Sequence, residues 1–130
     1  MSKLPPIDSD KELLLSYFTM ENLHDAIFWV DAEKKIFKVN NRAALMSGYT
    51  KEELSHMLIT DINPSATSMD WQRFWQDLRK EKKVVFEAQH KHKTGYLYDI
   101  EVTVNFIELE EKEFSCSIVR DIREKKAQEQ

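Results

Sequence analysis

The sequence predicts a single α+β domain in which antiparallel strands and short helices follow one another along the chain. Short apolar segments bounded by turn residues are typical of strands. Capping signals in front of segments with helical spacing of apolar residues indicate helices. At 130 residues, one domain with a substantial core is the natural expectation.

Charge and composition limit the function classes. The 19 basic and 23 acidic residues give a net charge of −4, so we expect no nucleic-acid partner, because phosphate neutralisation needs clustered Lys and Arg. The single cysteine, Cys116, rules out an internal disulfide and fits a reducing compartment. No apolar run approaches the roughly 20 residues that span a bilayer, and the Met-Ser-Lys-Leu-Pro-Pro start lacks the apolar stretch of a signal peptide. We therefore expect a cytoplasmic domain with no direct membrane insertion, free or carried as the cytoplasmic portion of a membrane-anchored protein.

The chain is expected to open with a flexible lead-in, residues 1–8, followed by a helix over residues 9–22. Ser9-Asp10-Lys11-Glu12 has capping-box spacing, and the helix has a broad apolar face that includes Leu14 and Phe18. This face either packs on its own domain or meets a second copy of the chain.

Residues 26–54 predict two strands and two short helices. Residues 27–30 are apolar at consecutive positions, which indicates a strand covered on both faces. After a polar turn, residues 36–39 form a second strand. Asn40 can cap the helix that follows, and Thr50-Lys51-Glu52-Glu53 has the spacing of a second helix start.

The rest of the chain predicts a helix and then three strands. Regular structure breaks at Asp61-Ile62-Asn63-Pro64, since the residue before proline is pushed out of helical geometry. A helix is predicted over about residues 69–80, and strands over 84–91, 98–108 and 113–121. The helix carries an apolar stripe that would wall a central cavity and consists of Trp71, Phe74, Trp75 and Leu78.

Lys93-Thr94-Gly95 predicts a three-residue hairpin loop with glycine in the left-handed conformation. This loop would place His90 opposite Tyr98 and Phe86 opposite Val102. One face of the hairpin is then apolar and consists of Val84, Phe86, Ala88, Ile100, Val102, Val104 and Phe106.

The order of these features resembles a PAS domain over roughly residues 22–123. The resemblance is carried by residues 26–54, by the hairpin at 93–95 and by Val119-Arg120-Asp121-Ile122-Arg123. That last segment is similar to the Asp-Ile-Thr ending with which many PAS domains continue into a signalling helix, with Arg123 in place of the threonine.

The resemblance implies an α+β fold with a five-stranded antiparallel sheet of strand order 2-1-5-4-3, short helices on one face and an N-terminal flanking helix. The PAS domain would occupy residues 23–122, and residues 123–130 would begin a C-terminal signalling helix or linker.

By similarity to flavin-binding PAS relatives, alternate residues of the sheet would line a ligand pocket, which the apolar stripe of the helix over residues 69–80 would wall. The predicted pocket consists of Phe28, Val30, Trp71, Trp75, His90, Tyr98, Ile100, Val102, Ser117 and Val119. Ser115 would also point inward. The outward side chains would be Ile27, Trp29, Phe114, Cys116 and Ile118. A patch this apolar implies a partner surface, covered by the N-terminal helix or by a second subunit. With Leu14 and Phe18 it would support a homodimer.

The resemblance also bears on cofactors. Light-sensing PAS relatives need a cysteine that adds to flavin, but Ile59 stands at the corresponding place and Cys116 lies far away, so a flavin–cysteine adduct is excluded. Haem-binding relatives usually place a histidine on the helix that walls the pocket, and residues 69–80 contain none, which argues against haem. Non-covalent flavin stays open, and no cofactor is predicted.

His90 and His92 form a His-x-His pair that is either half of a metal site or part of a polar rim. No third ligand is evident, so we expect no metal. His90 and Tyr98 could offer hydrogen bonds at the edge of an apolar cavity, or could bond to each other in a filled core. Ser117 could supply another inward hydroxyl.

Enzyme signatures are absent from the sequence. The only glycines, Gly48 and Gly95, leave no phosphate-binding loop, and Cys116 has no evident histidine base. We therefore expect no catalytic residues.

The leading hypothesis is a sensory input domain of a histidine kinase or cyclic-dinucleotide enzyme. It would bind a small ligand and relay a signal through Asp121, Ile122 and Arg123 to an effector beyond residue 130. One alternative is a ligand-free dimerisation scaffold whose bulky side chains fill the core. The other is a small stand-alone enzyme that uses His90.

Overall fold

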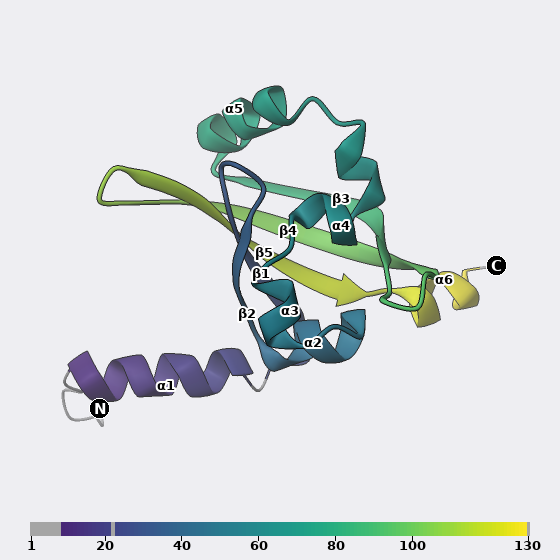
Figure 1. Cartoon of the computed structure of the whole chain (residues 1–130), viewed down its shortest axis with the longest axis horizontal. Coiled ribbons are helices and arrows are strands. Elements are labelled where there is room, and N and C mark those ends of the chain that lie inside the picture. Colours follow the sequence, from purple (N-terminus) through teal and green to yellow (C-terminus); the bar gives the residue numbers. More distant parts are fainter. Residues whose placement is uncertain (1–8, 22, 130) are drawn as a thin grey trace, which may run out of the picture.

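The computed structural model describes residues 9–21 and 23–129 (Figure 1), so the expected lead-in at 1–8 lies outside the described residues. Its sheet consists of β1 (Ala26–Asp31), β2 (Ile36–Val39), β3 (Lys83–Lys91), β4 (Leu97–Leu109) and β5 (Lys112–Asp121). Neighbouring strands are antiparallel and their order is β2-β1-β5-β4-β3. The predicted α+β fold and its strand order are therefore confirmed.

The helices lie close to their predicted positions. They are α1 (Ser9–Glu21), α2 (Asn41–Ser47), α3 (Lys51–Leu54), α4 (Ile59–Ile62), the 3-10 helix η1 (Pro64–Thr67), α5 (Trp71–Glu81) and α6 (Arg123–Gln128). The capping-box contacts of Thr50 and Glu53 begin α3 as predicted. Helix α5 begins slightly later than expected, because Asp70 caps it by accepting a hydrogen bond from the backbone N–H of Arg73. None of the helices in the described part of the chain has the length and apolarity needed to cross a lipid bilayer.

The register of the β3–β4 hairpin agrees with the prediction. His90 pairs with Tyr98 and Phe86 with Val102, and Gly95 has a positive φ of 107° in the loop. The inner face of the sheet packs against α2, α3, α4 and α5 in one core. This core includes Phe28, Val30, Ala43, Leu54, Ile62, Trp75, Leu78, Ile100, Val102 and Val119.

The fully buried side chain of Asn40 connects three elements through hydrogen bonds. Its Oδ1 accepts hydrogen bonds from the backbone N–H of Ile27 at 2.9 Å and of Ala43 at 3.0 Å. Its Nδ2 donates to the carbonyl oxygens of Met20 at 2.8 Å and Asp25 at 3.0 Å. The end of α1, the start of β1 and the start of α2 are therefore held by one amide.

Helix α1 projects away from the sheet (Figure 1). Its last turn is attached through the Glu21 carboxylate, which accepts from Lys51 Nζ at 2.7 Å and from the backbone N–H of Asn41 at 3.0 Å. Leu14 and Phe18 lie on its exposed surface. In this arrangement α1 does not cover the outer face of the sheet (Figure 1).

The outer face of the sheet carries the predicted apolar side chains. Ile27 is buried, and Trp29, Cys116 and Ile118 are half-buried. The indole Nε1 of Trp29 is buried without a hydrogen-bond partner among the described residues. Trp29 is therefore not freely exposed.

Candidate ligand cavity

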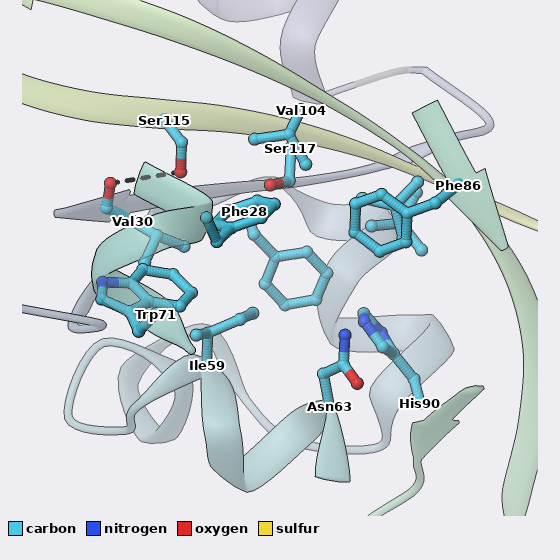
Figure 2. Close-up of a pocket in the computed structure, with 13 residues that line it drawn as sticks. Phe28, Val30, Ile59, Asn63, Trp71, Phe86, His90, Val104, Ser115 and Ser117 are labelled. Carbon is cyan, nitrogen blue, oxygen red and sulfur yellow. Dashed lines mark hydrogen bonds between the residues drawn. The ribbon is translucent and has the colours of Figure 1, made fainter. Parts of the chain in front are cut away.

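A cavity of about 40 Å³ lies between the inner face of the sheet and the helices that cover it (Figure 2). Its lining consists of Phe28, Val30, Ile59, Asn63, Trp71, Phe74, Phe86, His90, Val102, Val104, Ser115, Ser117 and Val119. Trp71 and Ile59 lie on one side of the cavity, and His90, Asn63 and Phe86 lie on the other (Figure 2). Because one water needs roughly 10–15 Å³ by this measure, the space takes about three water-sized groups.

Most of the predicted pocket residues line this cavity. They are Phe28, Val30, Trp71, His90, Val102, Ser117 and Val119. The structure corrects the placement of three others, which lie outside the lining. Trp75 donates its indole N–H to Glu113 at 2.8 Å, which turns the ring toward the far end of the sheet. Ile100 and Tyr98 are buried in the core nearer the start of β4, whereas the cavity meets β4 at Val102 and Val104.

Two lining residues, Ile59 and Asn63, carry no periodic signal in the sequence. Both belong to the short irregular segment around α4, where no alternation shows which side chains turn inward. The other additional lining residues, Phe74, Phe86, Val104 and Ser115, lie on faces whose inward direction the sequence predicts.

Aromatic rings on α5 and β3 narrow the cavity. The Trp71 indole N–H donates to the carbonyl oxygen of Ala32 at 2.8 Å, which fixes the direction of its ring. Phe74 packs against Trp71 with centroids 5.4 Å apart, and meets Phe86 edge-on at 6.3 Å. Edge-to-face contacts of this kind stabilise a defined wall.

His90 is the most unusual lining residue. It is 2% exposed and meets the ring of Phe28 edge-on at 5.7 Å. Its Nδ1 has no hydrogen-bond partner among the described residues. Burial lowers the pKa of His90 to about 4, so the imidazole is neutral near pH 7.

Tyr98 forms no hydrogen bond with the imidazole of His90. The two rings lie edge-on with centroids 6.2 Å apart, and the Tyr98 hydroxyl is itself buried without a partner in the described part of the chain. Burial raises the pKa of Tyr98, which keeps the phenol protonated. The predicted alternative of a bonded His–Tyr pair in a filled core is therefore not what forms.

Other polar groups face the cavity. Asn63 is 6% exposed, and its Oδ1 accepts a hydrogen bond from Ser65 Oγ at 2.6 Å. Its amide nitrogen points into the cavity in Figure 2. Ser115 Oγ donates to the Val30 carbonyl at 3.4 Å, a long contact. Ser117 is also buried in the lining.

His92 lies apart from His90. Its ring stacks on Tyr96 with centroids 4.5 Å apart, and its Nδ1 accepts from the backbone N–H of Thr94 at 3.1 Å. A Cβ on Gly48 would lie 2.5 Å from this imidazole, so glycine permits the close approach. Within the described ranges, no three His, Cys, Asp or Glu residues are grouped so as to hold a metal ion.

Cys116 is half-buried on the outer face of β5, and burial raises the pKa of its thiol to about 11. The thiolate that nucleophilic and adduct chemistry requires is therefore scarce near neutral pH.

The junction between β5 and α6 is held against the sheet by burial, hydrogen bonds and a cation–π contact. Ile122 is buried, and its backbone N–H donates to the carbonyl of Asp99 at 3.1 Å. Arg123 donates from Nε to Asp121 Oδ2 at 3.0 Å, and its guanidinium lies 5.2 Å from the centroid of the Tyr98 ring. The arginine that replaces the usual threonine thus reaches the strand partner of His90 through a cation–π contact.

A cavity enclosed by short helices against a sheet of order β2-β1-β5-β4-β3 defines the class of protein as one with a PAS fold. The sequence matches the family model described as PAS domain over residues 24–124, and the chain belongs to this family.

Solved structures show the same fold at low sequence identity. A PAS domain from a two-component sensor histidine kinase is 24% identical with a TM-score of 0.78, and the match covers 88% of this chain and 99% of that one. A PAS domain from Colwellia psychrerythraea is 22% identical with a TM-score of 0.79, over 87% and 98% of the two chains. A domain of a sensory box sensor histidine kinase/response regulator from Geobacter sulfurreducens is 18% identical with a TM-score of 0.74, over 88% and 97%. Comparison with curated proteins finds no significant match.

Proposed function

We propose that this PAS domain is a sensory input module of a multidomain signalling protein. A small ligand in the cavity would shift the packing of sheet and helices, and α6 would carry that shift to a linked effector. The observation that carries the proposal is the buried, unpaired His90 in the cavity lining. Similar structures from sensor histidine kinases favour an effector of that type over a cyclic-dinucleotide enzyme.

A short route of contacts supports the relay. His90 pairs across the hairpin with Tyr98, and the Tyr98 ring contacts Arg123 at the start of α6. Farther along the helix, Lys126 Nζ bonds to Glu87 on β3 at 2.7 Å. A ligand that moves His90 would therefore change the support of α6, provided that it binds two arrangements with different affinity.

Native mass spectrometry after gentle purification tests ligand binding. We expect reproducible extra mass on the wild-type chain, its loss in Ser117→Leu, which fills the cavity, and its retention in Ile118→Leu, which alters the next, outward-facing residue. Circular dichroism would verify that both variants fold. Absence of extra mass across expression hosts and ligand screens, or its persistence in Ser117→Leu, would contradict the proposal.

Hydrogen exchange of residues 123–128 tests the relay. Ligand removal should change the protection of this segment in the wild type. Arg123→Gln should retain the bound mass but lose the change in protection. Equal ligand-dependent changes in both proteins would exclude a route through Arg123.

We also propose a homodimer that buries the outer apolar surface, which consists of Trp29, Phe37, Phe114, Cys116 and Ile118. Phe37 is 46% exposed and its ring lies 5.4 Å from that of Phe114, which supports a surface covered by a second copy. Light scattering should show a dimer that Trp29→Glu dissociates. Leu45→Glu, at an exposed apolar residue on α2, should leave the dimer intact. If light scattering showed a wild-type monomer at micromolar concentration, the proposed homodimer would be refuted.

The small volume of the cavity favours a second candidate, the ligand-free dimerisation scaffold. For such a scaffold, native mass spectrometry should show a dimer without bound ligand, and the hydrogen exchange of α6 should be the same in all preparations. The enzyme alternative has less support, since burial alone lowers the pKa of His90 and the described lining contains no carboxylate or thiol. Activity that is insensitive to replacement of His90 would remove it.

A further inference from the structure

The chemical character of the cavity restricts what it can take. The described lining residues carry no acidic or basic side chain other than His90. That imidazole is neutral near pH 7, because burial lowers its pKa to about 4. A charged ligand would lose its hydration without gaining a counter-charge, which costs several kcal/mol.

The polar groups of the lining argue equally against a purely apolar occupant. A neutral imidazole has one donor nitrogen and one acceptor nitrogen. Nδ1 of His90 is buried and unpaired among the described residues, and a buried polar atom without a partner costs about 1–3 kcal/mol. The amide nitrogen of Asn63 points into the same space (Figure 2), because its oxygen is occupied by Ser65. The serine hydroxyl at position 117 lies on the β5 side of the lining.

We infer that the cavity binds a small uncharged molecule that has both a hydrogen-bond donor and an acceptor, with His90 as its principal partner. Short amides and alcohols belong to this class. This inference rests on the proposed function and specifies its ligand. The volume of about 40 Å³ limits the ligand to a few non-hydrogen atoms unless α5 moves.

Affinity is expected to be modest. The best very small ligands gain at most about 1.5 kcal/mol per non-hydrogen atom, so a five-atom amide that reaches about half of this ceiling binds with a Kd of about 2 mM. Nuclear magnetic resonance detects binding in this range directly on the folded chain.

The experiment compares propionamide, propionate and xenon as probes. Propionamide and propionate have nearly the same shape and differ in charge, and xenon is apolar. We expect propionamide alone to produce saturable shifts in the side-chain resonances of His90 and Asn63. His90→Leu should weaken this binding about tenfold, which equals about 1.4 kcal/mol. Ile118→Leu alters an outward-facing residue of β5 and should leave binding unchanged. Ser117→Ala, which preserves the histidine, provides a second cavity variant if His90→Leu fails to fold, and should also weaken binding.

The outcomes separate this inference from the proposed function. Tighter binding of propionate or xenon than of propionamide would overturn the uncharged, hydrogen-bonding class while keeping the cavity as a ligand site. If His90→Leu and Ser117→Ala both bound propionamide with unchanged affinity, these side chains would not be its hydrogen-bond partners, and the inference would be overturned. If none of the probes bound and no mass copurified with the protein, both the inference and the proposed function would fail.

Discussion

Acidification should destabilise this domain through His90 before its carboxyl groups are protonated. The folded state holds the imidazole buried with a pKa of about 4, whereas a histidine in an unfolded chain has a pKa of about 6.5. Between these values the unfolded state binds more protons than the folded state. The free energy of unfolding therefore falls as the pH falls from about 6.5 toward 4.

The two pKa values give the size of the effect. Between pH about 7.5 and about 5.5 the linkage relation predicts a loss of about 1.3 kcal/mol, or roughly tenfold in the unfolding equilibrium constant. The lower limit of pH about 5.5 stays above the range in which ordinary carboxyl groups titrate, near 4. His90 is 2% exposed, so solvent screening does not weaken the argument.

Urea unfolding followed by far-UV circular dichroism at the two pH values measures this loss. His90→Leu should abolish most of the pH dependence in the window, whatever its effect on stability at pH about 7.5. His56→Gln replaces an exposed histidine and should retain it. Equal pH dependence in the wild type and His90→Leu would refute the reasoning, because it would mean that the imidazole is protonated as easily in the fold as in the unfolded chain.

Two further predictions concern the stability contributed by the Asn40 side chain and by the two glycines. Asn40→Ala should lower the free energy of unfolding by about 3–5 kcal/mol, since it orphans buried backbone groups of three elements, while Asn41→Ala at an exposed site should cost less than about 1 kcal/mol. Gly48→Ala should cost at least about 1 kcal/mol more than Gly95→Ala. Both glycines have positive φ, but only a Cβ at Gly48 meets the His92 ring, at 2.5 Å, whereas that at Gly95 meets nothing within 4 Å. Thermal unfolding of the four variants measures both differences, and equal costs within either pair would contradict the corresponding contact.

Alternation and turn chemistry were enough to predict the strands and the register of the β3–β4 hairpin. The hairpin loop determined which residue of β3 faces which residue of β4, and Asn40 and Thr50 marked helix starts by their side-chain chemistry. These are local signals, in which each residue is interpreted together with neighbours a few positions away. The strand order came from the family resemblance, since pairing between distant strands leaves no local trace.

The exact cavity could not be predicted in the same way. Periodicity shows that Ile100 and Val102 share the inner face, but which of them meets empty space depends on the helix packed above. Trp75 shares the stripe of Trp71, yet a carboxylate on a distant strand draws its indole away. Asn63 lies in an irregular segment, where only the structure reveals that its amide turns inward. The direction of α1 was equally beyond the sequence, because its apolar residues form no single narrow face.

The side chains of strand β5 fall into two sets that lie on opposite faces of the sheet. Its odd-numbered positions from 115 to 119 are buried against the cavity side, and the even-numbered positions between them face the opposite side. With a ligand in the cavity and a second copy on the outer face, as proposed above, substitutions in one set would change recognition without changing assembly, or the reverse. Libraries restricted to the cavity-facing positions would test this separation, because they should change ligand specificity while the proposed dimer stays intact.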